Sequence, residues 1–243
     1  MNFSFSNEQI LMQEEVKKLL DKENSVKRNR TILEGEEKFD QELWKSLVAM
    51  GLTATTIPEE YGGIGMGFLE LCVIAEELGR GIAPVPFSSS VYLATTAILN
   101  SSNEEIKKEY LPKLAGGEII GTFAHSEKTS FPDESGIAVT IKGSKISGQK
   151  IAVPDGDIAD FAIVSASSGK KVGLYIVDLK DEKVSIETLD TFDPSRSHAN
   201  VSFDGATATS LEDDAWTSIE KLLDQSAVLF AFEQVGGAEA AMN

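Results

Sequence analysis

The chain has 243 residues, of which 42% are hydrophobic and 25% are charged, a composition typical of proteins that bury a core. The formal net charge of −17 argues against a nucleic-acid partner, because phosphate binding needs clustered Lys and Arg. A single cysteine, Cys72, excludes an intramolecular disulfide, and the two histidines, His125 and His198, are too few to suggest a metal site. The first residues lack a leader pattern and no stretch resembles a membrane span, so a cytoplasmic location is expected.

The first 117 residues are predicted to be helical. Ser6 and Gln9 have the spacing of a capping box, which predicts that a helix begins there. Asp40 is predicted to be the N-cap of a second helix, which carries an apolar stripe and ends at Gly51. Both helices present one apolar face, as expected of helices that pack on a common core.

Four glycines follow between Gly62 and Gly67. They lack the preceding strand and the Lys-Ser/Thr ending of a phosphate loop, so a turn between helices is predicted. A third helix is expected from Phe68 to Leu78 with Gly79 at its C-cap, a fourth over residues 88–99, and a fifth from Asn103.

After Gly117 the pattern changes to short apolar runs separated by Gly, Ser and Asp turns, which predicts an antiparallel β-sandwich or barrel. The expected strands cover residues 119–126, 137–141, 145–153, 161–165, 172–178, 184–189 and 198–203. Helical periodicity returns at Asp213. The predicted fold class is therefore α+β, with a helical domain at 1–117, a β domain at 118–208, and the first helix of a truncated helical bundle at 209–243.

Several motifs have the order and spacing of one known family. They include Phe3-Ser4-Phe5-Ser6, Pro58-Glu59-Glu60-Tyr61-Gly62-Gly63, Tyr110-Leu111-Pro112-Lys113-Leu114-Ala115-Gly116-Gly117, and Ser147-Gly148-Gln149-Lys150 followed by Ala159-Asp160. The chain resembles the acyl-CoA dehydrogenases along nearly its whole length. This resemblance implies FAD as cofactor, an acyl-CoA as substrate, an electron-transfer flavoprotein as electron acceptor, and a homo- or hetero-oligomer. The acyl chain is not indicated.

The resemblance also implies a binding site. In the family, two strands of the middle domain cover one face of the flavin, and here they match Phe123 to Glu127 and Ile151 to Gly156. The opposite wall is expected beyond Asn243. The cofactor-binding residues implied are Phe123, His125, Ser126, Ala152, Val153 and Pro154. Thr129 and Phe131, in the loop that follows, are implied to contact the substrate.

Some positions depart from the family pattern. Ala152 stands where many members have a Trp and Pro154 where many have a Thr. Proline offers neither a hydroxyl nor an N–H. The usual catalytic glutamate is expected beyond Asn243, and Phe230 occupies the position where some members carry it instead, one turn before Glu233. No catalytic residue is therefore assigned, and the 243-residue chain is expected to be inactive alone.

Three functions remain open on these residues. The first is FAD-dependent dehydrogenation of an acyl-CoA thioester, in which a glutamate removes the α-proton and a hydride leaves the β-carbon. The second is a non-catalytic subunit that supplies part of the cofactor or CoA site of a partner dehydrogenase. The third, more distant, is a flavin monooxygenase with the same fold.

Overall fold

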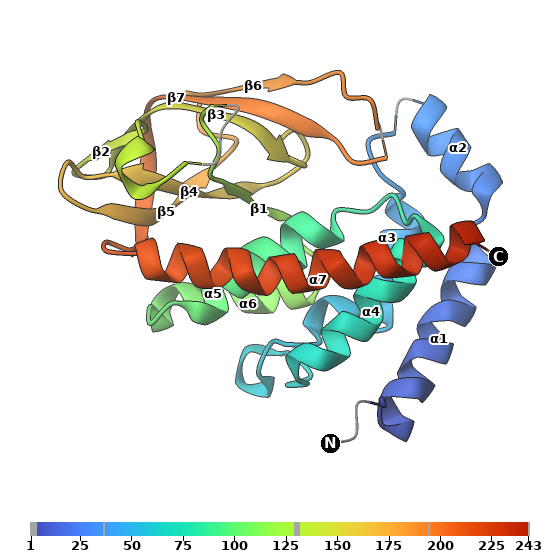
Figure 1. Cartoon of the computed structure of the whole chain (residues 1–243). Helices are drawn as coiled ribbons and strands as arrows, with labels where there is room; N and C mark the ends of the chain where they lie inside the picture. Colours follow the sequence, from blue (N-terminus) through green and yellow to red (C-terminus); the bar gives the residue numbers. More distant parts are fainter. Residues whose placement is uncertain (1–3, 36, 129–131, 194, 243) are drawn as a thin grey trace.

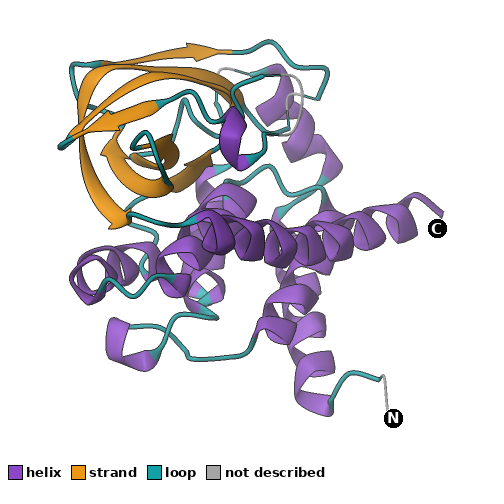
Figure 2. Ribbon diagram, turned by 60° about the vertical axis from the view of Figure 1, so that its left-hand side comes forward, coloured by secondary structure: helices purple, strands orange, loops and turns teal. Residues whose placement is uncertain are grey.

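A computed structural model describes residues 4–35, 37–128, 132–193 and 195–242. The helices lie on one side and the strands on the other, with the long helix α7 (Trp216–Met242) running between them (Figure 1). A view turned by 60° shows the curved sheet standing apart from the helices beneath it (Figure 2). The expected α+β fold, with a helical domain followed by a β-barrel-like domain and a further helix, is confirmed.

Helix α1 (Asn7–Glu23) begins at the predicted capping box, in which the Ser6 hydroxyl accepts from the Gln9 amide and the Gln9 side chain accepts from the Ser6 amide. Helix α2 (Val26–Glu34) was not predicted. Its sequence is mostly charged or polar and it buries only Ile32, so it has little of the apolar surface by which a packed helix is recognised. Docking against the rest of the chain stabilises such a short helix more than its own propensity does.

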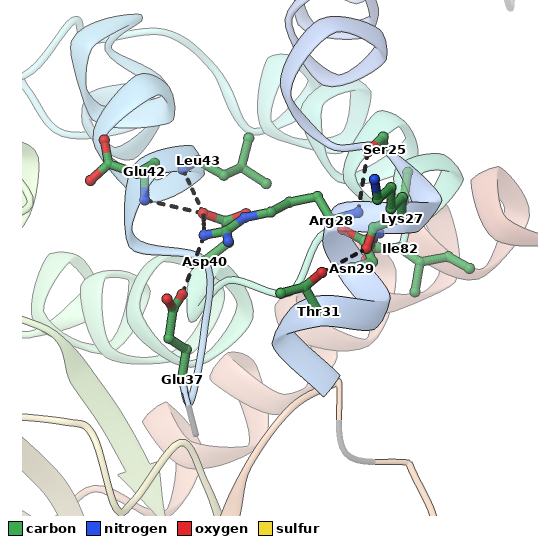
Figure 3. A network of polar contacts seen from close by, with 11 residues as sticks. Ser25, Lys27, Arg28, Asn29, Thr31, Glu37, Asp40, Glu42, Leu43 and Ile82 are labelled. Carbon is green, nitrogen blue, oxygen red and sulfur yellow. Dashed lines mark hydrogen bonds and ion pairs between the residues drawn. The ribbon is translucent and has the colours of Figure 1, made fainter. Parts of the chain in front are cut away.

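The predicted N-cap at Asp40 is confirmed and has a second role. Its carboxylate caps α3 (Gln41–Ala49) by accepting from the amides of Glu42 and Leu43, each at 3.1 Å. The same carboxylate accepts two hydrogen bonds from the Arg28 guanidinium, which joins α2 to α3 (Figure 3). Burial alone would raise the pKa of Asp40, but the Arg28 hydrogen bonds and the amides outweigh it and lower that pKa.

Two short 3₁₀ turns, η1 (Leu52–Ala54) and η2 (Glu59–Tyr61), lead through the glycine-rich turn into α4 (Phe68–Gly81). The predicted C-cap at Gly79 is wrong, because the helix continues to Gly81 and ends at Ile82, whose φ of 49° is left-handed. Gly79 instead lies where α4 crosses α7. A Cβ on Gly79 would lie 1.9 Å from the carbonyl oxygen of Glu233, so only glycine permits this approach.

The fourth predicted helix is divided. Its first part, η3 (Ser88–Thr95), is a π-helix and its second part, α5 (Thr96–Asn100), is an α-helix. The wider π turn brings Ser89 against Asp155 of the β domain, with a hydrogen bond of 2.6 Å. Helix α6 (Glu104–Ala115) follows, and Asn103, where the fifth helix was predicted to start, is its N-cap.

The β domain closes into a barrel of five strands with two more strands attached (Figure 1). The strands are β1 (Gly121–Ala124), β2 (Thr140–Lys142), β3 (Lys145–Pro154), β4 (Phe161–Ser167), β5 (Val172–Asp178), β6 (Val184–Thr188) and β7 (His198–Glu212). Strand β4 pairs with β2 and β5, β3 pairs with β2 and β7, and β5 pairs with β7, which completes the ring. Strand β1 is added to β4, and β6 to β7. Two pairings, β1–β4 and β2–β4, are parallel, although an antiparallel sheet was expected.

Candidate functional site

A cavity of about 430 Å³ lies where β1, β3 and η3 face α7. Its volume is within the range of small-molecule sites, roughly 300–1,000 Å³. Most of its lining is apolar, with a few polar side chains. The lining residues are Leu93, Phe123, His125, Ser126, Ile151, Ala152, Val153, Pro154, His198, Leu223, Ser226, Ala227 and Phe230.

The six residues that the sequence singled out for cofactor binding all line this one cavity. Two contacts join the strands that carry them. The amide of Ile151 donates to the carbonyl of Ser126 at 2.8 Å, and the Thr122 hydroxyl donates to the carbonyl of Pro154 at 2.5 Å. The two stretches therefore form one continuous wall. Thr129 and Phe131, the residues implied to contact the substrate, lie outside the described part of the chain.

The wall contains a bulge. The register between β3 and β7 shifts between Lys150 and Val153, and within that shift Ala152 takes a left-handed φ of 48°. Ala152 is exposed at the cavity, while Val153 next to it is buried in the barrel. The bulge thus turns residues out of the barrel's hydrogen-bond ladder and toward the cavity.

Helix α7 supplies the other wall, through Leu223, Ser226, Ala227 and Phe230. The opposite wall of a flavin site was expected beyond Asn243, and within the described chain α7 already borders the cavity. The ring of Phe230 packs edge-on against the buried Tyr92 of η3, with ring centroids 5.7 Å apart. This contact holds Phe230 at the cavity's edge.

No Asp or Glu side chain is among the described residues that line the cavity. Glu233, one turn after Phe230, forms an ion pair with Arg196 and lines a hollow of about 240 Å³ that shares Phe230 with the cavity. Its side chain thus has a structural partner away from the cavity.

Behind the wall lies a buried ion pair that sequence reasoning did not assign. Lys150, fully buried on β3, donates to Glu127 at 2.6 Å and to the carbonyl of His125 at 2.9 Å. Burial lowers the pKa of Lys150 to about 8, and the Glu127 carboxylate partly offsets this effect. Burial alone would raise the pKa of Glu127, but the hydrogen bond and charge of Lys150 outweigh it and lower that pKa.

His198 was expected only to begin a strand, and it does begin β7. It also lines the cavity, because its register partner on β3 is Pro154. A strand pairing between residues 154 and 198 could not be read from the sequence, so its place at the cavity was missed.

The buried His125 predicts a pH-dependent stability. Burial, and then the charge of Lys150, lower the pKa of His125 from 6.5 to about 4. The unfolded chain takes up a proton below pH 6.5 while the folded chain does not, so stability is lost as the pH falls between these values. The loss should reach on the order of 3 kcal/mol. Urea unfolding across this range should show a weaker pH dependence for His125→Leu than for the native chain, with His198→Leu as control. Identical profiles for His125→Leu and the native chain would contradict the prediction.

Within the ranges that the structure describes, no group of three or more His, Cys, Asp or Glu side chains is arranged to hold a metal ion. Nor does any helix of those ranges combine the length and apolar character that a membrane crossing requires.

Three comparisons with known proteins agree with this architecture. The family model described as "Acyl-CoA dehydrogenase, N-terminal domain" matches residues 6–118. Mitochondrial isovaleryl-CoA dehydrogenase of Pongo abelii is 32% identical over 171 residues, which cover 67% of this chain and 40% of the relative. Acyl-CoA dehydrogenase IpdE2 of Mycolicibacterium smegmatis is 30% identical over 239 residues, which cover 98% of this chain and 63% of the relative.

The solved ChsE4–ChsE5 complex from Mycobacterium tuberculosis has the same fold, with a TM-score of 0.88 at 24% identity over 99% of this chain and 66% of that one. A helical domain, a closed barrel and a long helix after it match the fold of solved acyl-CoA dehydrogenases. The chain belongs to the acyl-CoA dehydrogenase family. It spans 40% and 63% of the length of the two relatives above.

Proposed function

We propose that this chain forms the helical domain and the flavin-binding wall of an FAD-dependent acyl-CoA dehydrogenase. The proposed reaction introduces a double bond between the α- and β-carbons of an acyl-CoA thioester, with electrons passed to an electron-transfer flavoprotein. The observation that carries the proposal is the cavity, which gathers the six predicted cofactor residues from β1, β3 and the segment after β1. An oligomer and a cytoplasmic location stay predictions.

The residues present fit a flavin. Its ring system has an apolar body and a polar edge, and the cavity offers apolar side chains such as Ile151, Leu223 and Phe230 beside the hydroxyl of Ser126. When bound, FAD supplies the acceptor for the hydride that leaves the acyl group. The wall would hold the flavin through Ser126 and the backbone of residues 123–126, and the apolar lining would exclude water from the reacting atoms.

Blocking the cavity should remove flavin binding. Ala227 is exposed on α7 and lines the cavity, so Ala227→Trp places an indole in the space without disturbing the core. We expect FAD binding, measured by calorimetry or flavin fluorescence anisotropy, to weaken by at least about tenfold. Val228→Trp, at the next residue and 45% exposed, is the matched control and should bind within about twofold of the native chain. The proposal would be contradicted if the native chain bound no FAD, or if Ala227→Trp and Val228→Trp bound FAD equally well.

A second candidate function rests on one feature of the cavity. In the family that the chain resembles, some members carry the catalytic base at the α7 position that Phe230 occupies here. No carboxylate is found among the described residues that line the cavity. A base is needed to remove the α-proton. This favours a non-catalytic subunit that completes the site of a partner dehydrogenase.

The chain supplied with FAD and acyl-CoA thioesters of several lengths is expected to reduce no dye. The described lining offers no carboxylate, the kind of base that the resemblance implies for removal of the α-proton. Dye reduction by the chain alone would contradict this expectation.

To separate the two candidate functions, the tagged gene product can be purified from its natural host. Flavin that bleaches anaerobically with acyl-CoA supports the enzyme, whereas a colourless protein bound to an identified second dehydrogenase supports the subunit.

A further inference from the structure

A chain of hydrogen bonds runs from the buried ion pair to the cavity wall. The ammonium of Lys150 has three protons to donate, and three acceptors surround it: Glu127 at 2.6 Å, and the His125 carbonyl and the Ser165 hydroxyl at 2.9 Å each. The Ser165 oxygen also lies 2.9 Å from Nδ1 of His125. Lys150 therefore holds His125 twice, directly at its backbone and through Ser165 at its ring.

The chemistry of this chain fixes the direction of its protons. An ammonium can only donate, so the Ser165 oxygen accepts from Lys150. Ser165 is fully buried on β4, and a buried hydroxyl proton without an acceptor is costly. Nδ1 of His125 is positioned to take that proton. If Nδ1 carried its own proton, the hydroxyl proton would lose this acceptor.

We propose that Lys150 is a positioning residue for the cavity wall, and that through Ser165 it holds His125 as the uncharged tautomer with its proton on Nε2. The ring of His125 stacks on that of Phe123, with centroids 5.4 Å apart and planes within 11°, and both residues line the cavity. The wall thus presents an uncharged aromatic pair whose orientation is fixed from behind. The role of this pair toward FAD rests on the proposed function, whereas the tautomer does not.

The tautomer can be measured on the chain without any ligand. Long-range proton–nitrogen correlation spectra of ¹⁵N-histidine-labelled protein distinguish a protonated from an unprotonated ring nitrogen. The chain has only two histidines, so His198→Gln assigns the signals. At neutral pH we expect Nδ1 of His125 to be unprotonated and Nε2 to be protonated. A protonated Nδ1, in either the other tautomer or the charged ring, would overturn the proposal.

Two variants at position 165 test the relay without removing the buried charge. Ser165→Ala deletes the hydroxyl, and we expect the Nδ1 signal to move away from that of the native chain. Ser165→Thr keeps a hydroxyl and should restore the native signal. If Ser165→Ala leaves both nitrogens unchanged, the relay is refuted. The folded fraction is checked in the same samples by circular dichroism.

The positioning role has its own readout. FAD binding by Ser165→Ala should be about fivefold weaker than that of the native chain, with recovery in Ser165→Thr, as for the loss of one neutral hydrogen bond that orders the wall. Equal FAD binding by all three proteins would refute the positioning role. If the native chain binds no FAD but shows the expected tautomer and its change in Ser165→Ala, the proposed function fails while the assignment of the relay stands.

Discussion

Gly236→Ala is expected to lower the free energy of unfolding by at least about 2 kcal/mol. A Cβ on Gly236 would lie 1.8 Å from the carbonyl oxygen of Glu76, and the atom in its way belongs to the backbone of α4. Neither atom can move unless α4 and α7 separate. The better helix propensity of alanine, worth about 1 kcal/mol, offsets only part of this cost.

Gly237 provides the control at the adjacent residue. A Cβ there would meet its nearest atom, the carbonyl oxygen of Gly79, at 3.4 Å, which is an ordinary contact. Gly237→Ala should therefore be neutral or stabilising by up to about 1 kcal/mol. Urea unfolding followed by circular dichroism measures both variants. Equal stabilities for Gly236→Ala and Gly237→Ala would show that the two helices are not locked by this contact.

Lys150→Met is expected to have the larger effect, on the order of 3–5 kcal/mol at neutral pH. The substitution keeps the bulk of the side chain but leaves the Glu127 carboxylate, 5% exposed, without its counter-charge. It also removes the donor to the His125 carbonyl. The amides of Ala138 and Val139 still donate to Glu127, but they carry no charge to replace that of Lys150.

The loss of folding stability caused by Lys150→Met should become smaller as the pH falls. Without Lys150, burial raises the pKa of Glu127, so the carboxyl takes up a proton at mildly acidic pH and the buried charge disappears. The difference in stability from the native chain should therefore shrink as the pH falls. Lys18→Met is the control, since its ion pair with Glu15 is exposed, with 66% and 57% of the two side chains accessible. That variant should lose at most about 1 kcal/mol. A deficit that is constant with pH would argue against an unpaired Glu127.

Sequence rules that depend only on neighbouring residues predicted the starts of helices correctly. Ser6, Asp40 and Asn103 each begin a helix because their side chains accept from amides only two or three residues away. The same rules failed at Gly79, since glycine ends helices and also permits helices to cross closely, and only the position of α7 distinguishes these uses. Helix α2 was not predicted because its stability comes from contacts with other segments, including the ion pair of Arg28 with Asp40.

The sequence by itself determined the local motifs around residues 123–126 and 151–154, from which the resemblance implies one wall of the proposed site, and both stretches line the cavity. Only the tertiary structure decided what surrounds that wall. Strand pairing brings His198 beside Pro154, and the crossing of α7 over α4 places Phe230 at the cavity. Barrel closure buries Lys150 against Glu127 and Ser165, residues 23 and 15 positions away along the chain. These contacts depend on pairing and packing between distant segments, which no local pattern of residues encodes.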